Sequence, residues 1–248
     1  MLLLLLLATS RKLAASGVAF SEEARVREIA AEHAKTSDKE LSKYEQKQAS
    51  KLMSRKLNRI KQMDRDVESS LHSHLRSRAP WTTLPSLALR GRSVLCVGAR
   101  LGGEVRALTR LGALAIGIDF NPGPRNPWVM WGDATRLQFA NATFDYVYTN
   151  VVDHITPLFD FFADAARVLR TGGHLVLHVA HNAPDKFSVQ TFEGKSGGTD
   201  DLVQHVTRQR AFQVLSRKLY AGSGPKHATS DVLLATFDGG DELIFERK

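Results

Sequence analysis

With 248 residues, the chain is long enough for one large α/β domain with appendages, and its 43% hydrophobic and 24% charged content is that of a globular protein. The formal net charge of +8 belongs to residues 1–90, which carry 17 Lys and Arg against 10 Asp and Glu, while residues 91–248 carry 17 against 16. The charge therefore does not indicate nucleic-acid binding by the core of the protein. Cys96 is the single cysteine, which excludes an intrachain disulfide and a cysteine-based zinc site.

Residues 1–20 are predicted to be a targeting or hydrophobic leader. The leucine run at the start is too short to span a bilayer, which takes about 20 apolar residues. Two basic residues, Arg11 and Lys12, follow it, and no acid occurs before Glu22. The pattern fits a secretory or membrane leader and an organelle-targeting peptide equally well. A disordered start or a wrongly assigned initiator is a further alternative, so the compartment stays open.

Residues 21–79 are predicted to be a basic helical extension. Gly and Pro are absent between Glu22 and Arg78, and residues of high helix propensity dominate, with one break expected at residues 36–38. The apolar residues that share one face of this helix are Met53, Leu57, Ile60, Val67 and Leu71. We expect the helix to lie against the domain or a protein partner. Contact with a membrane surface or a nucleic acid is the alternative.

The segment 93–119 reads as a strand, a glycine turn, a helix and a second strand. The first strand is apolar and β-branched, and Gly98 after it allows a sharp turn and the close approach of a ligand. The amides near Gly102, where the helix begins, attract an anionic group. Asp119 ends the second strand 21 residues after Gly98, close to the roughly 20 expected for a carboxylate that accepts ribose hydroxyls. The segment therefore predicts a βαβ nucleotide-binding half.

Strands and helices alternate through the rest of the chain. We expect a helix over residues 158–169, stopped by Thr171-Gly172-Gly173, and a stiff proline-rich loop over residues 121–127. The expected strands cover residues 128–131, 144–149, 174–180, 212–220, 231–237 and 243–245. The strand-like runs after residue 211 predict a hairpin at the end of the chain.

The order of these motifs resembles that of the class I S-adenosylmethionine-dependent methyltransferases. The pieces that carry the resemblance are VLCVGARLGGEV, GIDFNPG, WGDA, FDYVYTN and RVLRTGGHLVLHV, and they cover roughly residues 93–180. More narrowly, VGARLGGEV and the later NVVDH resemble a plant-type group of methyltransferase-like proteins of undefined substrate.

The resemblance implies a fold and an activity. The fold is α/β, with a doubly wound, Rossmann-like, seven-stranded and mostly parallel sheet that ends in a C-terminal antiparallel hairpin. This domain would cover residues 80–248, behind the N-terminal helical extension. The activity is the transfer of a methyl group from S-adenosyl-L-methionine to an unidentified acceptor.

The resemblance also implies which residues hold the cofactor. Gly98 and its neighbours would let the methionine part lie against the backbone, and Asp119 would bind the ribose hydroxyls. Asp133 would accept from the adenine amine, with the Ala134 amide facing the ring. The implied cofactor-binding residues are Gly98, Ala99, Arg100, Gly102, Asp119, Phe120, Asp133, Ala134 and Asn150.

Two positions depart from the family's glycine motif. Cys96 stands where the family usually has an acid, and Arg100 stands where it has the middle glycine. The Arg100 side chain could cover the cofactor's carboxylate or crowd its sulfonium. A catalytically inactive methyltransferase-like scaffold that acts as an interaction module is therefore the alternative. A nicotinamide-dependent oxidoreductase is a second alternative, which would need the glycine that Arg100 replaces.

Candidate catalytic residues follow the fourth strand. A base is needed only where the acceptor must lose a proton, and the candidates are Asn150, Asp153 and His154. Equal alternatives are that Asp153 caps the helix that begins near Pro157 and that His154 packs at the rim. His154, His178 and His181 lack a cysteine or a close carboxylate pair that would complete a metal site, so a metal is not expected.

Overall fold

The computed structural model describes residues 54–77, 88–123, 125–180, 199–208, 210–221 and 239–248. The leader expected over residues 1–20 and the part of the helical extension before residue 54 lie outside these ranges, as does the strand expected over residues 231–237. All described elements belong to one compact unit, residues 51–248.

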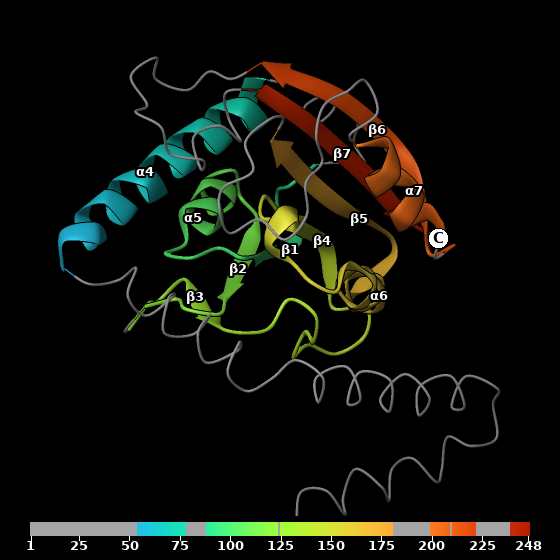
Figure 1. The fold of residues 1–248 in the computed structure, drawn as a ribbon, viewed down its shortest axis with the longest axis horizontal. Helices are drawn as coiled ribbons and strands as arrows, with labels where there is room; N and C mark the ends of the chain where they lie inside the picture. Colours follow the sequence, from blue (N-terminus) through green and yellow to red (C-terminus); the bar gives the residue numbers. More distant parts are fainter. Residues whose placement is uncertain (1–53, 78–87, 124, 181–198, 209, 222–238) are drawn as a thin grey trace, which may run out of the picture. The chain divides into compact units, whose positions relative to one another are not determined.

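A seven-stranded sheet forms the centre of this unit (Figure 1). Its strand order is β3-β2-β1-β4-β5-β7-β6. The strands from β3 to β5 are parallel, and β7 runs antiparallel to both of its neighbours. The expected fold is therefore confirmed, including the C-terminal antiparallel hairpin of β6 and β7. The strands are β1 Ser93–Val97, β2 Leu114–Asp119, β3 Val129–Trp131, β4 Phe144–Thr149, β5 Leu169–Ala180, β6 Phe212–Ala221 and β7 Gly239–Arg247.

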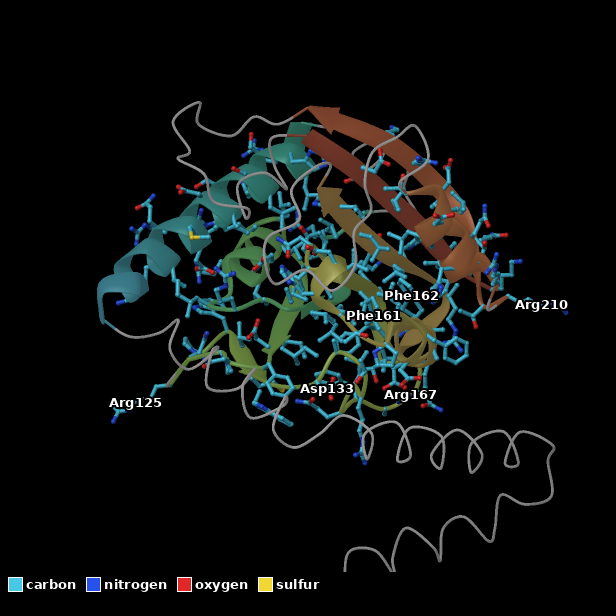
Figure 2. The ribbon with its side chains drawn as sticks, in the orientation of Figure 1. Arg125, Asp133, Phe161, Phe162, Arg167 and Arg210 are labelled. Carbon is cyan, nitrogen blue, oxygen red and sulfur yellow. The ribbon has the colours of Figure 1, made fainter. Side chains whose placement is uncertain are left out.

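Helices cover both faces of the sheet. They are α4 Ser54–Ser77, α5 Gly103–Arg110, α6 Leu158–Val168 and α7 Asp200–Arg208. Alternate residues of each strand point to opposite faces, so Leu95 packs on the side of α6 and α7, whereas Cys96 packs on the side of α4 and α5. On the first side, Phe161 and Phe162 of α6 are completely buried (Figure 2). Among the described helices, none is both long enough and apolar enough to cross a membrane.

The helix α4 lies against α5 through the face predicted from the sequence. Ile60, Val67 and Leu71 are buried, and Leu75 extends the same face. Burial of this stripe explains why a helix with a mostly polar surface is held at a fixed place on the domain. Contacts of its exposed basic residues with a protein, membrane or nucleic acid remain predictions.

The structure corrects two expectations in the second half of the chain. The strand β5 begins directly after α6, at Leu169, and not at His174. Between two points of its pairing with β4, β5 advances five residues while β4 advances two, so the predicted glycine turn is a bulge inside the strand. Gly172 has a φ of 74°, which suits such a bulge. The helix α7 was not predicted, and only Leu202 and Val206 of this short helix are buried.

Candidate functional site

Two carboxylates lie at the same edge of the sheet. Asp119 ends β2 and pairs in register with Trp131, the last residue of β3, and Asp133 follows two residues later. Because β2 and β3 are parallel neighbours, their carboxyl ends meet at one edge. Both acids are half-buried, and Figure 2 labels Asp133 at this edge. The predicted pair of acids is thus brought together.

Backbone amides orient the carboxylate of Asp119. Its Oδ2 accepts a hydrogen bond from the Arg100 N–H at 2.9 Å, and its Oδ1 accepts one from the Asn121 N–H at 2.7 Å. These bonds tie the end of β2 to the glycine turn. Each carboxylate oxygen can accept a second hydrogen bond, so Asp119 retains acceptor capacity for a ligand hydroxyl.

Asp133 sits in a turn directly after β3. Its Oδ1 accepts hydrogen bonds from the backbone N–H and from the hydroxyl of Thr135, both at 2.8 Å, which fixes the side chain locally. The ring of Phe120 packs at a tilt against that of Trp131, with centroids 5.8 Å apart. Ala134 is half-buried and packs on the core. The residues assigned to the adenosine thus surround the ends of β2 and β3.

The glycine turn is closely packed. Gly98 and Gly102 have φ angles of 78° and 95°, which side-chain-bearing residues rarely adopt. A Cβ on Gly98 would lie 2.2 Å from Cγ2 of Val151, and one on Gly102 would lie 2.7 Å from Cβ of Trp128. Ala99 is buried in the core, and its N–H donates to the Ile118 carbonyl at 3.0 Å. The turn therefore requires its glycines for packing as well as for conformation.

Arg100 adopts a left-handed conformation, with a φ of 43°. This conformation costs a residue with a Cβ about 1 kcal/mol or more, which explains why the family's pattern has glycine at this position. Its half-buried side chain lines a small hollow beside the turn. The residues that line this hollow are Met63, Asp64, Val67, Gly98, Arg100, Glu104 and Val151.

Glu104 is a buried carboxyl group in this hollow that sequence reasoning missed. Burial raises its pKa to about 8, with Asp64 and Asp119 adding to the rise while its backbone hydrogen bond and Arg100 lower it. Asn150, also buried, donates from Nδ2 to Oε1 of Glu104 at 3.3 Å. The signal in the sequence was the position of Glu104 in the first turn of the helix that follows the glycine turn. Nearby, burial and Glu104 together raise the pKa of the Cys96 thiol, which agrees with an inert core cysteine.

Two acids of α4 also reach this edge of the sheet. Asp64 accepts a hydrogen bond from the Gly103 N–H at 2.9 Å and pairs with Arg106, and Glu68 accepts one from Nε of Arg106 at 2.7 Å. The anion-attracting amide at the start of α5 is thus bound by the protein's own carboxylate. Asp64 and Glu68 are four residues apart and lie on the same helix face as Val67, and this spacing was the signal in the sequence for their contact with α5.

The structure places the three candidate catalytic residues after β4. Asp153 and His154 belong to a short 3-10 turn, and Oδ2 of Asp153 lies 3.6 Å from Nε2 of His154. The N-cap of α6 is Pro157, so Asp153 is not at the capping position. Among the described residues, His154 does not join His178 in a cluster. His178 lies instead beside His74 and Glu242, and His181 is outside the described residues.

This strand order, with acids after β2 and β3, defines the fold of the class I S-adenosylmethionine-dependent methyltransferases. Residues 95–177, about a third of the chain, match the model of the methyltransferase domain family. The match favours methyl transfer over the nicotinamide-dependent alternative. The narrower resemblance to a plant-type group remains a prediction.

Curated relatives match the same part of the chain. The phthiotriol/phenolphthiotriol dimycocerosates methyltransferase of Mycobacterium leprae (strain TN) is 36% identical over 107 residues, which cover 38% of this chain and 39% of the relative. The demethylmenaquinone methyltransferase of Mycobacterium sp. (strain JLS) is 37% identical over 98 residues, which cover 35% and 41%. The chain thus matches about two fifths of the length of these relatives.

Solved structures share the fold over a larger part of the chain. The 1,6-didemethyltoxoflavin-N1-methyltransferase of Burkholderia thailandensis, with 1,6-didemethyltoxoflavin and S-adenosylhomocysteine bound, has a TM-score of 0.56 at 14% identity and covers 85% of this chain and 89% of its own. A Haloferax volcanii protein assigned as a methyltransferase, in complex with the Trm112 methyltransferase activator, has a TM-score of 0.53 at 16% identity, covering 72% and 89%. At these identities the likeness concerns the fold alone.

Proposed function

We propose that the protein is an S-adenosylmethionine-dependent methyltransferase that binds its cofactor at the carboxyl ends of β1, β2 and β4. The observation that carries the proposal is the position of Asp119, a carboxylate at the end of β2 that is oriented by the N–H of Arg100 in the glycine turn. A carboxylate held there suits the ribose of a nucleoside. The methyltransferase domain family over residues 95–177 supports the choice of cofactor.

The polar side chains at the site fit the groups of this cofactor. Asp119 would accept from the ribose hydroxyls, and Asp133 would accept from the adenine amine, beside the ring of Phe120. Glu104 is a buried carboxyl whose charged form would be stabilised by a nearby cation, and the cofactor carries an ammonium and a sulfonium. Asn150 would hold Glu104 in place through its amide. In these assignments one acid serves the ribose hydroxyls, a second serves the adenine amine, and Glu104 serves the cationic part of the cofactor.

The chemistry leaves few tasks for the protein. S-adenosylmethionine supplies a methyl group that is already activated on sulfur. The chain's residues therefore contribute mainly by binding and orienting the reactants. Asp153 and His154, half-buried after β4, are the candidates to orient the acceptor or to take its proton where the acceptor must lose one.

The acceptor itself remains to be identified. The names of the curated relatives give phthiotriol or phenolphthiotriol dimycocerosates and demethylmenaquinone as what those proteins methylate. Because the alignments cover only about two fifths of each relative, they support the cofactor half of the site more than the acceptor.

Titration of the full chain with S-adenosylmethionine and with S-adenosylhomocysteine, followed by calorimetry, tests the proposal. We expect both to bind, and we expect Asp119→Ala to weaken binding. Arg170→Ala is the matched control, because Arg170 is exposed and bonds to Asp145 at the start of β4, at the opposite edge of the sheet. If the folded chain binds neither compound, the proposal fails and the inactive scaffold takes its place.

A further inference from the structure

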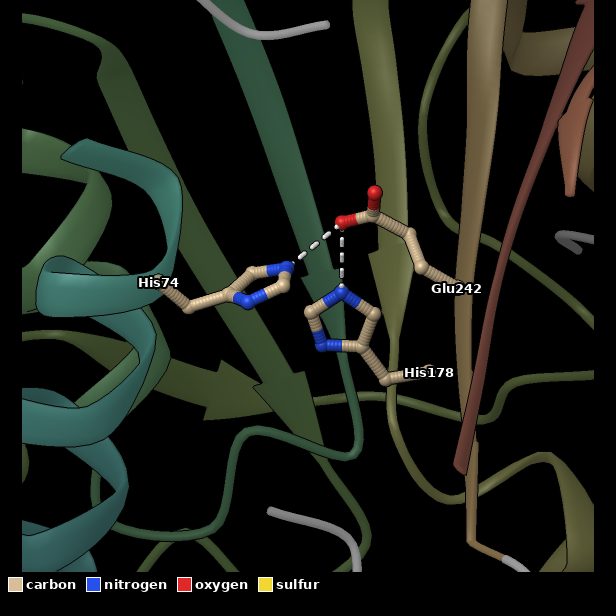
Figure 3. Close-up of side chains that lie close together, drawn as sticks. All are labelled: His74, His178 and Glu242. Carbon is tan, nitrogen blue, oxygen red and sulfur yellow. Dashed lines mark hydrogen bonds and ion pairs between the residues drawn. The ribbon is translucent and has the colours of Figure 1, made fainter. Parts of the chain in front are cut away.

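Three side chains from distant parts of the chain meet beneath the C-terminal end of α4. His74 comes from α4, His178 from β5 and Glu242 from β7, and Figure 3 shows their polar ends pointing toward one another. Oε2 of Glu242 lies 2.9 Å from Nε2 of His74 and 3.0 Å from Nε2 of His178. The side chains are only 10%, 1% and 2% exposed for His74, His178 and Glu242.

We propose that His74, His178 and Glu242 form a binding site for a divalent transition-metal ion, and that Zn²⁺ is the ion that best fits this ligand set. Two imidazole nitrogens and one carboxylate oxygen are a recurrent set of protein ligands for zinc. Ligand atoms that sit about 2.0–2.2 Å from one tetrahedral ion are about 3.4 Å apart. The two nitrogen–oxygen distances, 2.9 and 3.0 Å, are about 0.4–0.5 Å shorter than this, so the ligand atoms would move apart by that amount to admit an ion; all three lie within 4.8 Å of one another.

The surrounding contacts accommodate the change of protonation that metal binding needs. Without an ion, Nε2 of each histidine is hydrogen-bonded to Oε2 of Glu242, and Nδ1 of His178 is hydrogen-bonded to the Tyr148 hydroxyl at 3.0 Å. With an ion, the Nε2 lone pair of His178 goes to the metal and its proton resides on Nδ1, which then donates to the same hydroxyl. A metal-binding histidine usually donates its other ring N–H to an oxygen acceptor, and the Tyr148 hydroxyl would take that place. Tyr148 can therefore serve both states, because a hydroxyl both donates and accepts.

The site includes His178 at the carboxyl end of β5, and it shares α4 with the hollow at the glycine turn. His74 and Glu242 are 168 positions apart in the chain, so an ion between them would tie α4 to β7. About two to three turns before His74, the α4 residues Met63, Asp64 and Val67 line the hollow at the glycine turn. A bound ion would fix the helix that forms one wall of the proposed cofactor site.

Metal binding to the full chain, prepared without a histidine tag and stripped with a chelator, tests the proposal. Zn²⁺ is titrated by calorimetry, and the bound ion is counted by mass spectrometry after gel filtration. The absorption spectrum of the Co²⁺-loaded chain reports whether nitrogen and oxygen ligands surround the ion. The variants are His74→Ala and Glu242→Gln, and the control is His72→Ala, a half-buried histidine of the same helix outside the cluster.

We expect one ion per chain in the unchanged protein and in the His72→Ala control. We expect binding to weaken by more than about 100-fold in His74→Ala and Glu242→Gln, since loss of an outer partner of a ligand already costs about 10–100-fold. The proposal is overturned if the unchanged chain binds no Zn²⁺, or if either folded variant binds as the control does. Circular dichroism establishes folding, and His74→Ala decides the matter if Glu242→Gln is unfolded. None of these readouts depends on cofactor binding or on methyl transfer.

Discussion

Replacing Glu104 with glutamine removes a buried ionisable group while keeping the size of the side chain. In the native protein this carboxyl lies among Asp64, Asp119, Arg100 and Asn150, and burial raises its pKa from 4.5 to about 8. The unfolded chain releases the proton near pH 4.5, whereas the folded chain retains it up to about pH 8. The native protein therefore loses stability as the pH rises through this interval.

The size of the effect follows from the shift. One pKa unit corresponds to about 1.4 kcal/mol, so the penalty accumulates to roughly 3 to 5 kcal/mol between pH 4.5 and pH 8. The Glu104→Gln protein lacks this penalty. We expect the difference in unfolding free energy, variant minus native, to grow by about 1 kcal/mol per pH unit and to level off above pH 8.

Urea unfolding of both proteins at several pH values between 5 and 9 measures this difference. The slope with pH is the decisive quantity, because any constant effect of the amide on packing cancels from it. Glu246→Gln is the control, since Glu246 accepts a hydrogen bond from Gln213 at the surface, and its difference from the native protein should stay level. Parallel curves for Glu104→Gln and the native protein would refute the assignment of a protonated, buried carboxyl.

Three further substitutions test the site. Arg100→Gly should raise the unfolding free energy by about 1 kcal/mol, because glycine adopts the left-handed conformation without strain, and it should also change cofactor affinity. Arg125→Gly is the control: Arg125 is exposed and has a φ of 54° (Figure 2), so this substitution should change only stability. Asp119→Ala should weaken cofactor binding by about 1–3 kcal/mol, because ribose hydroxyls lose their acceptor. Asp64→Ala should lower the unfolding free energy by about 2 kcal/mol, because it leaves the buried Gly103 amide without its acceptor and removes one of the two carboxylates that pair with half-buried Arg106.

Each of these has an outcome that contradicts it. Equal effects of the two arginine substitutions on cofactor affinity would show that Arg100 does not border the cofactor. An unchanged dissociation constant in Asp119→Ala, measured by calorimetry, would remove the ribose assignment. A wild-type urea midpoint in Asp64→Ala would show that α4 is held by its apolar face alone.

The core of the fold could be predicted from the sequence because its signals are local. Apolar runs bounded by turn residues marked β1, β2 and β4, Asp119 followed from its spacing after the glycine turn, and Asp133 followed from the resemblance to the class I methyltransferases. The helix α7 escaped because only two of its residues are buried, and the start of β5 escaped because a bulge interrupts its pattern. Short or interrupted elements carry too few periodic residues to be recognised.

The rest of the site depends on contacts between distant segments. Glu104 and Asp64 are 40 positions apart, and only the packing of α4 on α5 shows that both face one hollow. The cluster of His74, His178 and Glu242 joins three elements whose spacing in the sequence carries no pattern. The histidines considered together with His178 from the sequence, His154 and His181, do not include His74, which is its partner in the described cluster.

The last strand of the chain occupies an interior place in the sheet, between β5 and β6. During synthesis, β6 emerges before β7, its pairing partner among the described strands, and the edge of β5 that pairs with β7 stays uncovered until residues 239–247 are released. A chain that stops short of these residues would therefore present two unpaired edges, which are sites of aggregation. The addition of β7 therefore completes the β6–β7 hairpin and, through Glu242, also provides the contact with His74 that holds α4.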